Sequence, residues 1–211
     1  MAIYTTFFLC NPQQLAAGFP RWRSPLPTAV KRVVKNPFTG QAMTIETREP
    51  EWPEGAFAEP QNYERQVVAI KGEYRDYQDY LEGRLPAFVR GQPHWAAKGL
   101  MEIEVGALAE ALDCESSLEC ALYPPPSSSK ALQKIPAAAT RALALLDADG
   151  LNAIATKWAA TMSGPDYTQS TTGEVLSDGW SQGDAMEALR PIAALARKAA
   201  ADQQMYLLTE A

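Results

Sequence analysis

Apolar and polar positions alternate most clearly over residues 30–52, VKRVVKNPFTGQAMTIETREPEW. β-Branched valines lead into the turn sequence Asn-Pro-Phe-Thr-Gly, and Met43, Ile45 and Thr47 then alternate with polar neighbours. Proline suits the first central position of a turn, and Gly40 tolerates a positive φ where the return strand would begin. The stretch therefore predicts a β-hairpin.

Three further segments have the pattern of strands. Residues 3–9, IYTTFFL, place aromatic or β-branched side chains on both faces, which predicts a central strand. Residues 66–71, QVVAIK, are rich in β-branched residues and predict a second strand. Residues 101–105, MEIEV, alternate apolar residues with Glu102 and Glu104, which predicts a half-exposed strand carrying two solvated carboxylates.

An acidic, tyrosine-rich segment separates the second and third of these strands. Its tyrosines recur every three residues, a spacing that places them along one face of a short helix. Its acidic residues fill much of the remaining surface of that helix. The segment comprises Tyr74, Tyr77 and Tyr80 together with Asp76, Asp79 and Glu82.

The C-terminal half is predicted to be mainly helical. Residues 107–112 and 117–122 also favour helix, and residues 124–129, PPPSSS, then form an extended connector. Beyond it, Pro136 suits the first position of a helix running to about residue 146, and Asp149 can cap the next helix. That second helix carries a buried stripe at i, i+3, i+4, i+7 and i+11, namely Leu151, Ile154, Ala155, Trp158 and Met162.

The last two elements are a helix and a strand. Residues 184–201 predict a helix that Pro191 should kink or split, and residues 204–209, QMYLLT, predict a closing strand. A lone C-terminal strand needs partners, so we expect it to join the N-terminal sheet. The chain is then one α+β domain, residues 1–211, with a mixed or antiparallel sheet packed against helices. Its strand-rich part is 1–123, its surface connector 124–129 and its helical part 130–211.

Charge changes sign across the predicted hairpin. Residues 1–48 carry six Lys or Arg and one Glu, whereas residues 49–123 carry six Lys or Arg and fifteen Asp or Glu. The whole chain of 211 residues has a formal net charge of −6, which argues against nucleic-acid binding. No apolar run is long enough for a membrane span, and no secretory leader is visible, so a cytoplasmic protein is expected. Three cysteines fit a reducing compartment.

Candidate catalytic chemistry is sparse. His94 is the single histidine, and no G-x-S-x-G sequence presents a serine to it, so a loop or packing role is favoured over a small hydrolase or transferase. Cys10 is expected to be a buried thiol. Cys114 and Cys120 lie six residues apart, which does not make a metal pair on one helix face. Glycine motifs for nucleotides are absent from the sequence, and no cofactor is expected.

The acidic and aromatic residues form the best candidate for a partner-binding surface. Tyrosine supplies contact area at low entropic cost, and carboxylates attract a basic partner. A packing role for the tyrosines is the alternative. The basic residues Arg21, Arg23, Lys31 and Arg32 could also meet this surface in a neighbouring copy of the chain. The candidate partner-binding residues are Glu49, Glu51, Trp52, Tyr74, Asp76, Tyr77, Asp79, Tyr80 and Glu82.

Two long stretches carry a family resemblance. ALALLDADGLNAIATKWAATM, starting at residue 142, and ALRPIAALARKAAADQQMYLL, starting at residue 188, resemble the C-terminal region of a group of uncharacterised bacterial proteins. The YTTFFL, NPFTG and TREPEW sequences are similar to members of the same group. Some of these proteins look like immunity proteins of polymorphic or contact-dependent toxin systems. The resemblance implies a non-enzymatic protein that neutralises a toxin by direct binding, and the acidic surface predicts that the toxin domain is basic. A structural or self-assembling module is a further alternative.

Overall fold

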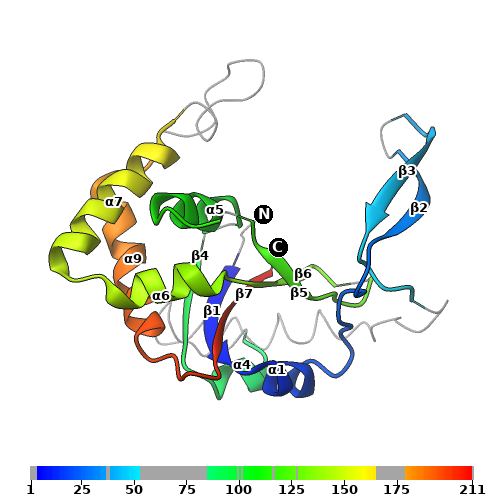
Figure 1. Ribbon diagram of the computed structural model, residues 1–211, viewed down its shortest axis with the longest axis horizontal. Coiled ribbons are helices and arrows are strands. Elements are labelled where there is room, and N and C mark those ends of the chain that lie inside the picture. The colour runs from blue at the N-terminus through cyan, green and yellow to red at the C-terminus, as the bar shows by residue number, and fades with distance from the viewer. Residues whose placement is uncertain are drawn as a thin grey trace, which may run out of the picture.

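The computed structural model describes residues 4–36, 39–52, 85–98, 100, 102–115, 117–126, 128–164 and 179–210. Its centre is a five-stranded sheet with the order β4-β1-β7-β6-β5, in which every recorded pairing is antiparallel. The C-terminal strand lies between the first strand and β6 (Figure 1), which confirms that the last strand joins the N-terminal sheet. The strands are β1 (Tyr4–Cys10), β4 (His94–Lys98), β5 (Glu119–Leu122), β6 (Lys130–Lys134) and β7 (Gln204–Glu210).

Helices cover both faces of this sheet. Phe7, Leu9 and Leu207 point toward a core built with four helices, whereas Phe8 and Tyr206 point toward a smaller core containing the other two. The larger layer contains α5 (Glu102–Ala111), α6 (Ala137–Leu145), α7 (Ala148–Met162) and α9 (Gln182–Ala196). The smaller layer contains α1 (Pro12–Gly18) and α4 (Ala87–Arg90). The α+β class is thus confirmed, with an antiparallel sheet.

β1 and β7 are central because both of their faces are apolar. Residues 5–10 and 205–209 are all buried, so neither strand has a solvated side. Their register pairs Phe7 with Leu207 and Phe8 with Tyr206, which puts one apolar pair on each face. This arrangement confirms the central position expected for the first strand and explains how a C-terminal strand is stabilised by the N-terminal half.

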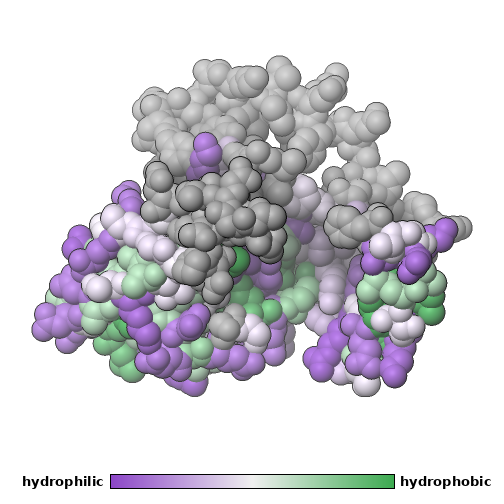
Figure 2. Space-filling view, turned by 90° about the horizontal axis from the view of Figure 1, so that it is seen from above, coloured by the Kyte–Doolittle hydropathy of each residue, from purple (hydrophilic) through white to green (hydrophobic). Residues whose placement is uncertain are grey.

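The predicted hairpin forms a separate two-stranded sheet, β2 (Val30–Lys35) with β3 (Ala42–Thr47). Gly40 has a φ of 70°, as expected at the start of the return strand, while residues 37 and 38 of the turn lie outside the described residues. The hairpin stands beside the main body at the right of Figures 1 and 2. Figure 2 shows apolar surface in green on the hairpin. The large apolar side chains exposed on its strands are Val30, Val33 and Met43.

Two predicted segments have the wrong type. Residues 101–105 were expected to be a strand, but Glu102 begins α5, because its acidic first turn suits a helix N-terminus and the following apolar residues continue the helical spacing. Residues 117–122 were expected to be helical, but residues 119–122 form β5 and pair with β6. That partner strand was not predicted, since KALQK lacks β-branched residues. The connector at 124–129 joins these two paired strands.

Helix ends differ from the prediction in smaller ways. The cap of α7 is Asp147, whose side chain accepts a hydrogen bond from the Gly150 amide at 2.8 Å, and not Asp149, which lies in the first turn. Pro191 lies inside α9, which is not split there. Ala155, Trp158 and Met162 are buried, as the α7 stripe predicted. The predicted strand at 66–71 and helix at 74–82 lie outside the described residues.

Candidate binding site

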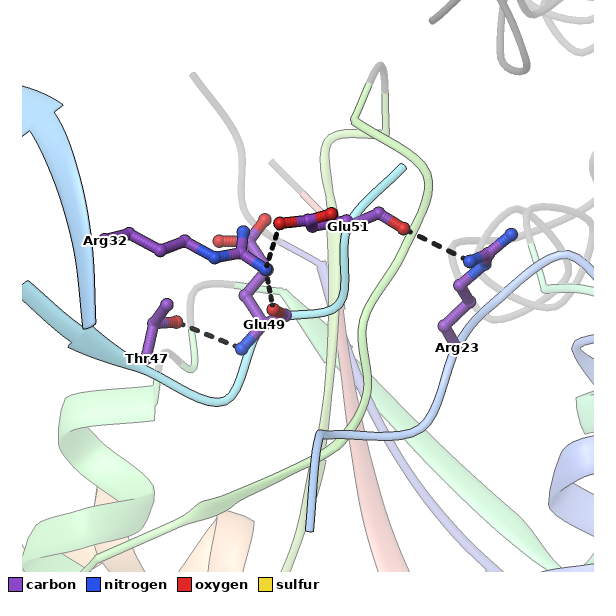
Figure 3. A network of polar contacts seen from close by, with 5 residues as sticks. All are labelled: Arg23, Arg32, Thr47, Glu49 and Glu51. Carbon is purple, nitrogen blue, oxygen red and sulfur yellow. Dashed lines mark hydrogen bonds and ion pairs between the residues drawn. The ribbon is translucent and has the colours of Figure 1, made fainter. Parts of the chain in front are cut away.

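The segment of residues 49–52 leaves β3 at the base of the hairpin and is held there by two arginines. Arg32, on β2, donates from Nη2 to the carbonyl oxygen of Glu49 at 2.7 Å. Arg23, in the loop before the hairpin, donates from Nη1 to the carbonyl oxygen of Glu51 at 3.1 Å (Figure 3). Hydrogen bonds from charged donors are stronger than neutral ones, so the backbone of this segment is well anchored.

Both arginines bind backbone oxygens, which leaves the carboxylates in solvent. The Glu51 side chain is 90% exposed, and its Oε1 lies 4.0 Å from Nη2 of Arg32. An ion pair this long and this exposed contributes little to stability. Glu49 is also exposed, whereas Pro50 between the two glutamates is buried. The segment therefore presents two carboxylates on a fixed backbone, beside two compensating guanidinium groups.

Trp52 completes this segment through a cation–π contact. The guanidinium carbon of Arg23 lies 4.9 Å from the centroid of the half-buried Trp52 ring. The backbone of Arg23 also exchanges hydrogen bonds with Tyr123, at 3.0 and 2.7 Å, directly after β5. A further bond joins the Leu26 amide to the Arg48 carbonyl at 2.7 Å. The segment is thereby tied to the edge of the main sheet.

The Cys120 thiol and the Tyr123 phenol are hydrogen-bonded to each other near this segment. Burial raises the pKa of Cys120 to about 11, with a hydrogen bond from Tyr123 opposing the shift and the carboxylates of Glu49 and Glu102 adding to it. Burial is also the main cause that raises the pKa of Tyr123. A thiol that stays protonated at neutral pH is a weak nucleophile, so this cluster does not have the electrostatics of a reactive cysteine.

The other candidate catalytic residues lie apart from this segment. His94 begins β4, pairs with Phe8 and places Nδ1 2.8 Å from the Gln92 carbonyl oxygen, a local contact that fits a packing role. Cys10 is fully buried at the end of β1, and burial raises its pKa to about 12, so the prediction of a buried thiol is confirmed. All three cysteines are free thiols. Among the described residues no cluster of three metal-ligating side chains is found.

The two glutamates of residues 101–105 do not share a solvated face, as the sequence had suggested. Glu104 is buried, and its carbonyl oxygen accepts a hydrogen bond from Nε1 of Trp158 at 2.9 Å. Glu102 is exposed, and its Oε1 accepts a hydrogen bond from the Thr209 hydroxyl at 3.4 Å. The prediction of a solvated strand face is wrong because these residues lie on a helix, where positions two apart point in different directions.

The structure describes only part of the predicted binding surface. It brings Glu49, Glu51 and Trp52 together, whereas the remaining candidates fall outside the described residues: Tyr74, Asp76, Tyr77, Asp79, Tyr80 and Glu82. Sequence reasoning missed that Arg23 and Arg32 contact residues 49–52 within the same chain. The opposite charges of these arginines and the glutamates were a signal in the sequence. The residues are too far apart in the chain, however, for that signal to indicate a contact.

No family model, no curated protein and no solved structure matches this chain. In the part of the chain that the structure describes, no helix has the length and apolar character needed to cross a membrane.

Proposed function

We propose that this protein is a binding protein of the immunity type, which neutralises a bacterial toxin by covering a basic surface of the toxin domain. The observation that carries the proposal is the arrangement of residues 49–52. Arg23 and Arg32 hold the backbone carbonyls, and the carboxylates of Glu49 and Glu51 extend into solvent. Because the backbone of this segment is already held in place, binding does not have to order it, which favours affinity.

The aromatic ring beside these carboxylates supports the same proposal. Trp52 is half-buried and stacked under Arg23, so it offers a rigid apolar edge next to two acidic groups. Tryptophan and arginine are both enriched among the residues that dominate binding energy at protein interfaces, whereas carboxylates are more common at the rim. The acidic balance of residues 49–123 adds long-range attraction for a basic partner.

Co-expression with the product of the adjacent reading frame tests this function directly. We expect the chain to relieve growth inhibition by that product and to form a complex with it whose affinity falls as salt concentration rises. Relief of toxicity without any complex, or no relief at all, would contradict the proposal.

Charge reversal tests where the partner binds. The double variant Glu49→Lys/Glu51→Lys should weaken the complex, and Asp76→Lys, Asp79→Lys and Glu82→Lys test the rest of the predicted surface. Glu187→Lys is the control, since Glu187 is also exposed but lies on α9 in the helical layer. An affinity independent of salt and unchanged by these reversals would refute the acidic surface as the interface.

A further inference from the structure

A recess lies between α6 and the connection, residues 197–203, that leads from α9 into β7 (Figure 1). Its volume is about 510 Å³, within the range of roughly 300–1,000 Å³ that is usual for binding sites. Alanines line much of it, both on α6 and in the connection, and their short side chains leave the space unfilled. The fully buried residues that line it are Ile135, Ala196 and Met205.

Hydrogen bonds hold both walls of the recess in place. Arg197 donates from Nη2 to the carbonyl oxygen of Leu146, which ties the end of α6 to the end of α9. Within the connection, the Gln203 amide donates to the Ala200 carbonyl oxygen at 3.0 Å, and Oε1 of Gln203 accepts from the Ala200 amide at 3.1 Å. The recess is therefore preformed, and binding does not have to order its walls.

The side chain of Leu145 projects beside this recess. It is 84% exposed, which makes it the most exposed large apolar side chain in the described part of the chain. Leu145 directly follows Ala144 and lies one helical turn after Arg141, and both of those residues line the recess. A single exposed leucine is ordinary on a protein surface. This one differs because it stands at the edge of an apolar recess that it does not itself fill.

Two side chains of opposite charge also line the recess. Arg141 contributes a guanidinium group from α6, and Asp202 contributes a carboxylate from the connection. Both residues are exposed, and among the residues that the structure describes neither side chain has a hydrogen bond or an ion pair. The patch therefore carries a positive and a negative charge that do not neutralise each other within one chain.

These features make the patch complementary to itself. In an interface with two-fold symmetry the same patch serves both subunits, so each protruding group needs a matching recess on the same surface. A two-fold axis between Leu145 and the recess brings each leucine to the recess of the other copy. Arg141 lies one turn before Leu145 on the same helix, so it then approaches Asp202 of the other copy.

We propose that this patch is a dimer interface between two copies of the chain, in which each Leu145 occupies the other copy's recess and Arg141 pairs with Asp202 across the two-fold axis. A different partner would need only the leucine or only the recess, whereas a second copy uses both, together with both charges. The patch is separate from residues 49–52, so the proposal does not depend on the proposed function.

The size of the patch sets the expected affinity. It consists of one helix of nine residues and one short connection, which is less than the roughly 800 Å² per subunit of a standard interface. We therefore expect a weak dimer, with a dissociation constant in the micromolar range.

Sedimentation velocity of the full chain over a range of concentrations tests the dimer. We expect the sedimentation coefficient to rise with concentration toward that of a dimer, and Leu145→Asp to remain a monomer. Val33→Asp is the control, because Val33 is 74% exposed but lies on β2 of the hairpin, and it should dimerise as the unsubstituted chain does. A strict monomer at millimolar concentration, or equal behaviour of the two variants, would overturn the proposal.

Filling the recess tests the other half of the contact. Ala144→Leu places a larger side chain at the recess without changing any charge, and leucine keeps the helical propensity of this position. We expect it to weaken the dimer by about tenfold or more, since the incoming Leu145 loses its space. Circular dichroism establishes that each variant is folded. A folded Ala144→Leu variant with unchanged dimer affinity would refute insertion into the recess.

Exchanging the two charges tests the two-fold arrangement. Arg141→Asp and Asp202→Arg each place like charges across the interface, and each should weaken the dimer by roughly tenfold. Arg141→Asp/Asp202→Arg reverses both signs and should restore the affinity. The two side chains are not paired within one chain, so this recovery would report their contact between copies. A double variant as weak as the single ones would overturn the pairing of Arg141 with Asp202 and the two-fold arrangement with it.

Discussion

Trp158→Phe is the substitution whose effect can be worked out most directly. The Trp158 side chain has no exposed surface, and it links α7 to α5 by donating from Nε1 to the Glu104 carbonyl at 2.9 Å. Its ring also lies 4.9 Å from that of Trp180, centroid to centroid. α5 contributes Val105 and Leu108 to the same core as Trp158, so this contact helps to hold the helix in place.

Three losses add up in this variant. Phenylalanine cannot donate the hydrogen bond, and this loss costs about 1 kcal/mol of unfolding free energy. The cost is no larger because the Glu104 carbonyl oxygen keeps its regular place in the helical hydrogen-bond pattern. The smaller ring buries roughly 40 Å² less apolar surface, or about 1 kcal/mol at 25 cal/mol per Å². The space left behind, roughly 40 Å³, adds about 1 kcal/mol if the neighbours do not close it. We expect a destabilisation of about 2–3 kcal/mol.

Urea unfolding followed by far-ultraviolet circular dichroism measures this change without relying on tryptophan emission. The matched control is Trp52→Phe, which makes the same chemical change at a half-buried ring near the surface and should cost less than about 1 kcal/mol. A Trp158→Phe variant within about 0.5 kcal/mol of the unsubstituted protein, or no more destabilised than the control, would show that the α5–α7 contact does not have the role assigned to it.

Two further predictions concern a helix cap and the buried thiols. Asp147→Ala should cost about 1 kcal/mol of unfolding free energy because it removes the hydrogen bond to the Gly150 amide. Asp149→Ala should cost clearly less. Equal losses of the two variants in thermal or urea unfolding would contradict the assignment of the cap. The free energy of unfolding should also fall as pH rises above about 9. Burial raises the pKa of Cys10 to about 12 and that of Cys120 to about 11, and unfolding returns both pKa values to about 9. Unfolding at high pH therefore releases protons and becomes more favourable as pH rises. Urea unfolding between pH 8 and 11 should show this decline, and a Cys10→Ala/Cys120→Ala variant with the same pH slope would refute its cause.

The candidate site was predicted only in part. Glu49, Glu51 and Trp52 were identified because acidic and aromatic residues follow the hairpin directly. The contacts of Arg23 and Arg32 with this segment span 28 and 17 residues, and no local pattern carries information about such a distance. The surroundings of Cys120 were missed for a related reason. They come from a helix that had been taken for a strand and from a strand that had not been predicted, so their side chains could not be placed together.

The local sequence pattern was sufficient to predict an element wherever the periodicity of its own side chains determines its structure. The two apolar faces of β1 and β7, the turn and alternation of the β2–β3 hairpin and the buried stripe of α7 all follow from side-chain periodicity, and with them the α+β class. The short runs MEIEV, residues 101–105, and SLECAL, residues 117–122, are different, since five or six residues fit either the helical or the strand period. Burial against Trp158 and pairing with β6 decided their conformation. The position of residues 49–52 likewise depends on long-range contacts, because Arg23 and Arg32 hold the backbone of that segment from separate parts of the chain.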